Sequence, residues 1–93
     1  MATVDVTCTE KGKAYSCEVE VREGGGSTHH TVTVEQEDYE RLAGGEASVE
    51  ALVAESFRFL LEREPKESIL RRFELTVINR YFPEYERKIR GRL

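Results

Sequence analysis

Long apolar stretches and targeting signals are missing from this 93-residue sequence. It has no run of 18 apolar residues, the length that a membrane-spanning helix needs. Its first residues, Met1 to Asp5, hold no basic stretch followed by an apolar one, so we expect no secretory signal. These absences predict a cytoplasmic protein that does not enter a membrane.

Cysteine is scarce as well. The chain has two, Cys8 and Cys17, which are too few for a disulfide scaffold. We therefore expect two buried, reduced thiols that behave as small hydrophobic side chains. A Cys8–Cys17 disulfide is the alternative if the strand register makes the two residues direct neighbours and the compartment is oxidising.

Motifs that carry chemistry are also missing. The sequence has no Walker, EF-hand, zinc-finger or dinucleotide-binding pattern. Neither His29 nor His30 has a neighbouring nucleophile together with an orienting acid. The two rings cannot share a metal ion, since successive strand residues point to opposite faces. We therefore expect no catalytic, cofactor or metal site, and a protein that is not an enzyme.

What the sequence does contain is a change of period near Glu35. Apolar residues recur at every second position from Thr3 to Val34, and at every third or fourth position from Glu37 to Leu61. A period of two is typical of strands with one buried face, and a period near 3.6 is typical of helices. We predict antiparallel strands at 3–9, 14–22 and 28–35, with a tight turn at Gly12 between the first two.

The second half predicts two helices and a C-terminal wrap. An acidic first turn begins a helix at 36–44, and Gly44-Gly45 ends it. Ser48 caps a longer helix at 48–64, which stops before Pro65. Apolar residues cover so much of this helix that it must be buried on two sides. We expect the second cover to come from three short helices at 68–73, 76–82 and 83–89.

These elements predict a single α+β domain of residues 1–93, with a sheet half (1–35) and a helical half (36–93). A three-stranded antiparallel meander would carry the helices on one face. Residues 90–93 follow the last strong apolar residues, and Gly91 interrupts a helix there, so we expect them to be mobile.

The charges are divided unevenly along the chain. Residues 1–70 hold 7 Lys/Arg and 15 Asp/Glu, a balance of -8, whereas residues 71–93 hold 7 and 3, a balance of +4. An acidic body with a basic C-terminus favours either an acidic partner for the tail or a contact between the tail and the body.

Candidate partner-binding residues follow from this division. Tyr and Arg are typical anchors of protein interfaces, and the C-terminal segment is rich in both. We predict a small non-catalytic interaction or regulatory module that binds another protein through this segment. An unpaired sheet edge is a second contact, through which the protein could form a homodimer. The candidates are Arg71, Arg72, Arg80, Tyr81, Tyr85, Arg87 and Lys88. The alternative is that the tyrosines complete the core.

A nucleic-acid-binding regulator is the alternative function. Residues 31–64 resemble the ribbon-helix-helix DNA-binding unit, with a strand, a short helix, Gly44-Gly45 and a longer helix. The resemblance implies a dimer that places paired strands in the major groove. The outward residues of this strand include no Arg or Lys, however, and phosphate neutralisation supplies much of DNA affinity. The basic tail would then have to supply the charge.

Overall fold

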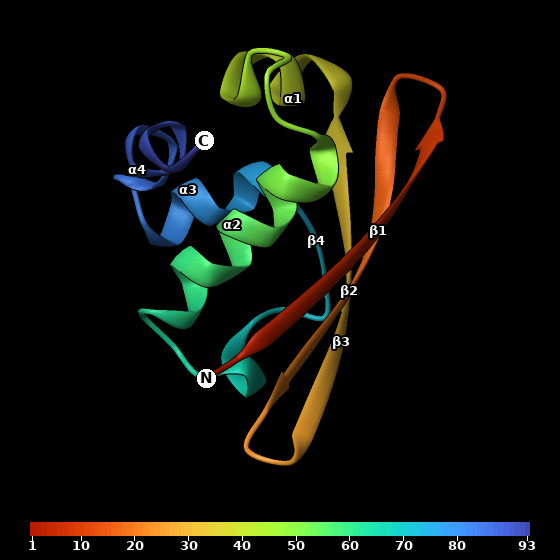
Figure 1. Ribbon diagram of the computed structural model, residues 1–93. Coiled ribbons are helices and arrows are strands. Elements are labelled where there is room, and N and C mark those ends of the chain that lie inside the picture. The colour runs from red at the N-terminus through yellow and green to blue at the C-terminus, as the bar shows by residue number, and fades with distance from the viewer.

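Three long strands form an antiparallel meander, as the alternating pattern predicts. The computed structural model describes residues 1–93 and contains β1 (Thr3–Lys11), β2 (Ala14–Glu23) and β3 (Gly26–Glu35), with helices packed on one face (Figure 1). The α+β class is confirmed. The sheet is open, with strand order β1-β2-β3-β4.

The register of the first hairpin places the two cysteines opposite each other. A loop of Gly12 and Lys13 joins β1 to β2, and Gly12 has a φ of 62°. Cys8 therefore pairs with Cys17, and the two form a disulfide. The expectation of two reduced thiols is wrong in this structure, because cross-strand neighbours are close enough to be bridged.

A fourth strand, β4 (Arg72–Glu74), replaces the helix predicted at 68–73. It lies parallel to β3, with Phe73 opposite Val32. The Thr31 N–H donates to the Arg71 carbonyl at 2.8 Å. The apolar spacing of residues 69, 70 and 73 suits a helix, but this local signal is overridden because β3 has a free edge to fill.

The two predicted main helices are confirmed as α1 (Gln36–Ala43) and α2 (Val49–Leu61). Gly44 ends α1 in the left-handed conformation, and the Ser48 side chain accepts the Ala51 N–H at 3.0 Å to begin α2. The predicted end of the second helix at residue 64 lies beyond the observed end at Leu61.

The rest of the chain forms short elements that pack on α2. They are the 3-10 turns η1 (Lys66–Ser68) and η2 (Leu75–Val77), and the helices α3 (Ile78–Tyr81) and α4 (Tyr85–Arg92). Residues 90–92 belong to α4 and are not separate from the fold. Arg92 forms an ion pair with Glu62 of the α2 end at 2.6 Å. A helix therefore continues through Gly91, where we expected an interruption.

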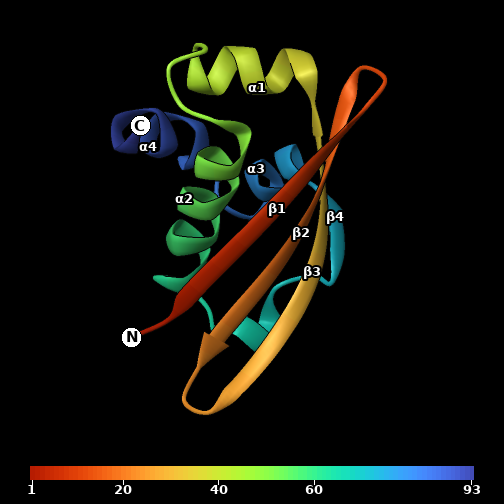
Figure 2. The same cartoon turned by 45° about the vertical axis from the view of Figure 1, so that its right-hand side comes forward.

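The core lies between the sheet and α2, with α4 on the other side of that helix (Figure 2). Leu52, Val53 and Phe57 are fully buried in α2, as is Ile89 in α4. The prediction that α2 is covered on two sides is thus confirmed. No helix is both long and apolar enough to cross a membrane.

Candidate binding groove

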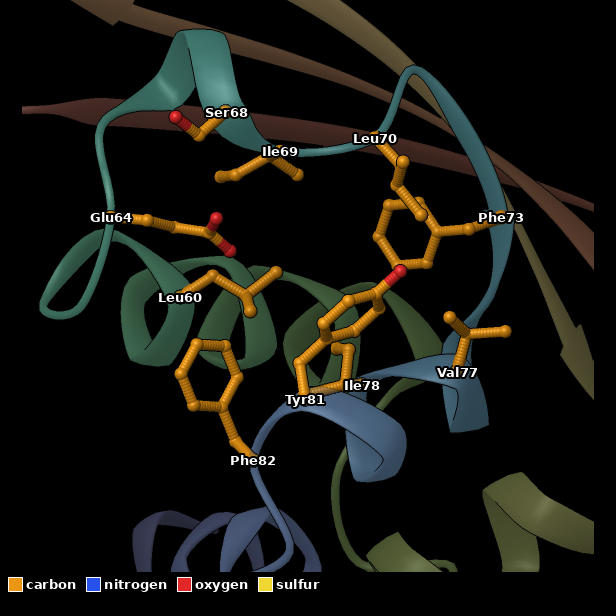
Figure 3. Close-up of a pocket in the computed structure, with 10 residues that line it drawn as sticks. All are labelled: Leu60, Glu64, Ser68, Ile69, Leu70, Phe73, Val77, Ile78, Tyr81 and Phe82. Carbon is orange, nitrogen blue, oxygen red and sulfur yellow. The ribbon is translucent and has the colours of Figure 1, made fainter.

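An open groove of about 140 Å³ lies beside the C-terminal end of α2 (Figure 3). We call it the α2–α3 groove, because its walls come from α2, α3 and the segment between them. Eight of its ten lining residues are hydrophobic. They are Leu60, Glu64, Ser68, Ile69, Leu70, Phe73, Val77, Ile78, Tyr81 and Phe82.

One wall of the groove, formed by residues 69–73, is held by β3. His30 Nδ1 lies 2.7 Å from the Leu70 carbonyl oxygen, and this ring nitrogen must donate because a carbonyl only accepts. His30 Nε2 then accepts from the Thr28 hydroxyl at 2.9 Å. Burial holds the pKa of His30 below its ordinary value, although the bond to Leu70 opposes this effect. His30 is therefore a neutral structural residue that fixes the position of Leu70.

The opposite wall is held by an arginine stacked on aromatic rings. The Arg63 guanidinium carbon lies 3.6 Å from the centroid of the Phe59 ring, and Arg63 Nη1 donates to the Phe59 carbonyl at 3.0 Å. The Phe59 ring meets the Phe82 ring edge-on, with centroids 5.9 Å apart. These contacts fix Phe82 against α2, so the groove is formed before any ligand is present.

The rim carries two large apolar side chains that remain in solvent. Leu70 is 47% exposed and Tyr81 is 65% exposed. Figure 3 shows the Tyr81 ring reaching across the mouth of the groove toward Leu70 and Phe73. The only other exposed large hydrophobic residues are the chain ends, Met1 and Leu93.

A single carboxylic side chain, that of Glu64, lines the groove. Its carboxyl group points inward, between Leu60 and Ile69 (Figure 3). Burial raises the pKa of Glu64 above its ordinary range, and the carboxyl group is not part of any ion pair. The groove therefore offers one carboxyl group as a hydrogen-bond acceptor in mostly apolar surroundings.

Tyr85 does not belong to the surface, contrary to our expectation. It is 0% exposed, and its hydroxyl lies 2.5 Å from Ser56 Oγ, which itself donates to the Leu52 carbonyl at 2.7 Å. Burial raises the pKa of the Tyr85 phenol. The alternative that a C-terminal tyrosine completes the core is thus correct for Tyr85, while Tyr81 is exposed.

The predicted cationic candidates are exposed but are spread over β4, α3, α4 and the residue that precedes β4. Arg71 and Arg80 adjoin the rim residues Leu70 and Tyr81 in sequence, whereas Arg72 lies in β4 and Arg87 and Lys88 lie in α4. None of these five forms an ion pair. No residue of α4 lines the groove, so the structure does not gather the candidates into one site.

Most groove residues were missed as site residues by sequence reasoning. Ile69 and Leu70 are both apolar, so the sequence alone predicts that both belong to the core. Ile69 is buried and Leu70 is exposed because of the path that the chain takes after Pro65. Glu64 gave no signal among the many acidic residues of the body. No group of three or more His, Cys, Asp or Glu side chains is placed to hold a metal ion. The arrangement is suited to binding an apolar group.

Comparisons with protein-family models, with curated proteins and with solved structures found no match to this chain.

Proposed function

We propose that this protein is a small non-catalytic interaction module that uses the α2–α3 groove to bind a segment of another protein. One observation carries the proposal: apart from the chain ends, the only large apolar side chains left in solvent are Leu70 and Tyr81, and both lie at the rim of the same apolar groove. Exposed apolar residues around a concave surface are typical of interaction sites.

The size of the groove favours a side chain over a small-molecule ligand. Its volume of about 140 Å³ is below the range of roughly 300–1,000 Å³ that is usual for small-molecule sites. One or two apolar side chains of a partner would occupy it. Such anchors, inserted in a pocket that already exists, supply most of the energy of many protein interfaces.

The surrounding charges favour acidic residues next to these anchors. Arg71 and Arg80 are exposed cations without ion pairs, next in sequence to the two rim residues. An acidic side chain on the partner would gain a pairing there. Glu64 would instead repel an acidic group placed in the groove itself and would accept an N–H from the partner. The proposed partner is an amphipathic segment with apolar anchors flanked by Asp or Glu.

Nucleic-acid binding through the basic tail stays the alternative prediction. The free cations of β4 and α4 supply the positive charge for it, and its affinity would fall steeply with salt. A dimer like that of the ribbon-helix-helix unit needs a free edge on the strand that pairs. Here β3 lies between β2 and β4, so neither of its edges is free.

Selection from a random-peptide display library tests the groove proposal, because no partner need be known. We expect the selected peptides to share apolar anchors beside Asp or Glu. We expect a rim variant, Leu70→Ser with Tyr81→Ser, to lose them while keeping its thermal stability, since both side chains are exposed. The matched control is Arg87→Ala with Lys88→Ala, two exposed cations of α4, which should bind the peptides normally.

Two outcomes would overturn the proposal. If the selected peptides bind the rim variant as tightly as they bind the parent protein, the binding site lies elsewhere. Loss of binding in the α4 variant, together with steep weakening by salt, would instead favour the basic tail as the contact surface.

A cytoplasmic location is a further part of the proposal, and the disulfide gives it a test. Disulfides persist mainly in oxidising compartments, so in the cytoplasm we expect Cys8 and Cys17 to be reduced, although their positions allow the bond. Rapid alkylation of the protein in intact cells should modify both thiols if the location is cytoplasmic. Protection of both thiols until a reductant is added would place the protein in an oxidising compartment.

A further inference from the structure

The β1 edge of the sheet has unpaired backbone groups. β1 is the first strand in the sheet order, and only β2 pairs with it. In an antiparallel pair, residues alternate between hydrogen-bonded and non-hydrogen-bonded positions, and the Cα atoms of the second kind lie closer together. Cys8 and Cys17 have Cα atoms 4.0 Å apart, which marks a non-hydrogen-bonded pair.

This alternation identifies the backbone groups that are free. Residues 3, 5, 7, 9 and 11 bond to β2, so the N–H and C=O groups of the even-numbered residues point away from the sheet. The side chains of Val4, Val6 and Cys8 face the core but are only partly buried. The same three residues thus offer both unpaired backbone groups and incompletely covered apolar side chains.

Several of the usual protections of an edge strand are absent from β1. Native proteins blunt such edges with proline, bulges, short strands, inward-pointing charges or a covering helix or loop. Helix α2 does pack against β1, but it leaves the inner side chains of the strand partly exposed. β1 is nine residues long, pairs with β2 without interruption, and has no proline and no charged residue on its inner face between Thr3 and Thr9. Its one charge in that stretch, Asp5, lies on the outer face and is paired with Arg22. A second strand could therefore add to this edge without burying an unpaired charge.

We propose that two copies of this chain pair through β1 in antiparallel orientation, about a two-fold axis at Val6, to form a continuous eight-stranded sheet. In this register Val6 faces its own copy and Val4 faces Cys8, so the partly buried apolar side chains cover one another. On the outer face Asp5 lies opposite Thr7, and no like charges face each other. This proposal does not depend on the α2–α3 groove, which adjoins the opposite edge of the sheet.

The alternative registers are less complementary. A two-fold axis at Cys8 places the apolar Val6 opposite the charged Glu10. An axis at Val4 leaves Cys8 without a partner residue. Within β1, the register at Val6 pairs residues 3–9 of both copies and satisfies the free groups of three hydrogen-bonded pairs. That amounts to about six hydrogen bonds, within the range of roughly 5–15 that is usual for a whole protein interface.

Amide hydrogen exchange over a concentration series tests the pairing directly. We expect the amides of Val4, Val6 and Cys8 to exchange quickly in dilute protein and to become protected as its concentration rises. The amides of Asp5 and Thr7 already bond to β2, so their protection should change little. Sedimentation equilibrium on the same samples should show a monomer converting to a dimer.

A spin label attached at Lys11→Cys then reads the register. With an axis at Val6, the two labelled positions lie ten residues apart along the paired strands, or about 33 Å at 3.3 Å per residue. An axis at Cys8 would bring them to about 20 Å. The Val6→Pro variant, which removes one outward N–H at the axis, should weaken dimerisation by about tenfold or more.

Three results would overturn the proposal. The first is a monomer at every concentration. The second is a dimer in which the amides of Val4, Val6 and Cys8 stay unprotected. The third is an edge that becomes protected only when a foreign β-strand peptide is added, which would identify the occupant as another protein. Since Val6→Pro could disturb folding, the exchange pattern of the unaltered chain decides the question.

Discussion

The sheet half and the C-terminal segment are held together in different ways. Residues 3–35 are joined by two tight hairpins, a register without interruption and one disulfide, all between neighbours in the sequence. Residues 62–93 form only short helices, turns and one three-residue strand, and distant residues tie them to the rest of the fold. The His30 ring and the Thr31 N–H donate to the carbonyl groups of Leu70 and Arg71. The hydroxyl groups of Ser56 and Tyr85 form a hydrogen bond.

This difference bears on where a binding surface can form. Inside the meander, backbone groups pair between sequence neighbours, so the surface of its two faces is set by strand alternation and is polar on the outer face. A segment fixed at a few points leaves apolar side chains between those points partly uncovered. The α2–α3 groove lies between two such points, the His30–Leu70 bond and the packing of Phe82 on Phe59. Binding surfaces are often built on irregular segments that a rigid scaffold positions.

The strongest test of this comparison is Tyr85, the largest fully buried side chain of the segment. We expect Tyr85→Ala to lower the free energy of unfolding by about 3–5 kcal/mol, because it removes a ring from the core. Tyr85→Phe should cost only about 1 kcal/mol, the usual worth of one hydrogen bond. Urea denaturation measures both. A loss below 1 kcal/mol for the alanine variant would mean that the segment is loosely attached to α2.

A second test uses pH and the bond between His30 and Leu70. Burial lowers the pKa of His30 in the folded protein, so the unfolded chain takes up a proton first as the pH falls. The stability that the neutral ring supplies is therefore present above about pH 6.5, the unfolded value, and is lost as the pH falls toward the folded pKa.

The matched variants for this pH test are His30→Gln and His29→Gln. Denaturation midpoints are measured between about pH 8 and pH 5, the range around the unfolded pKa of histidine. The decrease of the midpoint with falling pH should be smaller in His30→Gln than in the parent protein. The second variant removes an exposed ring from the other face of β3 and should keep the slope of the parent. A parent protein whose stability does not fall in this range would show that His30 is accessible to water.

A smaller effect is expected from Glu64 in the groove. Its pKa is raised by burial, so the folded protein binds a proton more readily than the unfolded chain. Stability should therefore rise as the pH falls through the folded pKa, and ionisation costs stability at neutral pH. We expect Glu64→Gln to stabilise the protein at pH 7 by a few tenths of a kcal/mol, up to about 1 kcal/mol. Destabilisation would mean that the carboxylate has a partner.

The same division between local and distant contacts explains what the sequence could predict. The strands, and the side of each strand that faces the core, follow from the alternation of apolar residues and from the turn at Gly12. The end of α1 follows from Gly44, and the start of α2 follows from the Ser48 cap. All of these signals are local in the sequence. β4 could not be predicted, because three residues pair with a strand some forty positions earlier. The sequence also could not predict that Tyr81 is exposed while Tyr85 is buried. Both tyrosines fit the same apolar spacing, and the Ser56 hydroxyl that bonds to Tyr85 lies in another element, α2.

The claim that the α2–α3 groove is a preformed site for apolar side chains is tested most directly by methyl NMR during a titration with indole. We expect shifts concentrated in the methyl groups of Leu60, Ile69, Leu70, Val77 and Ile78. These shifts should vanish in the Leu70→Ser, Tyr81→Ser variant, while the methyl groups of Leu42 and Val49 stay unchanged in both proteins. Shifts of equal size in Leu42 and Val49, or no shifts in the groove at saturating indole, would contradict it.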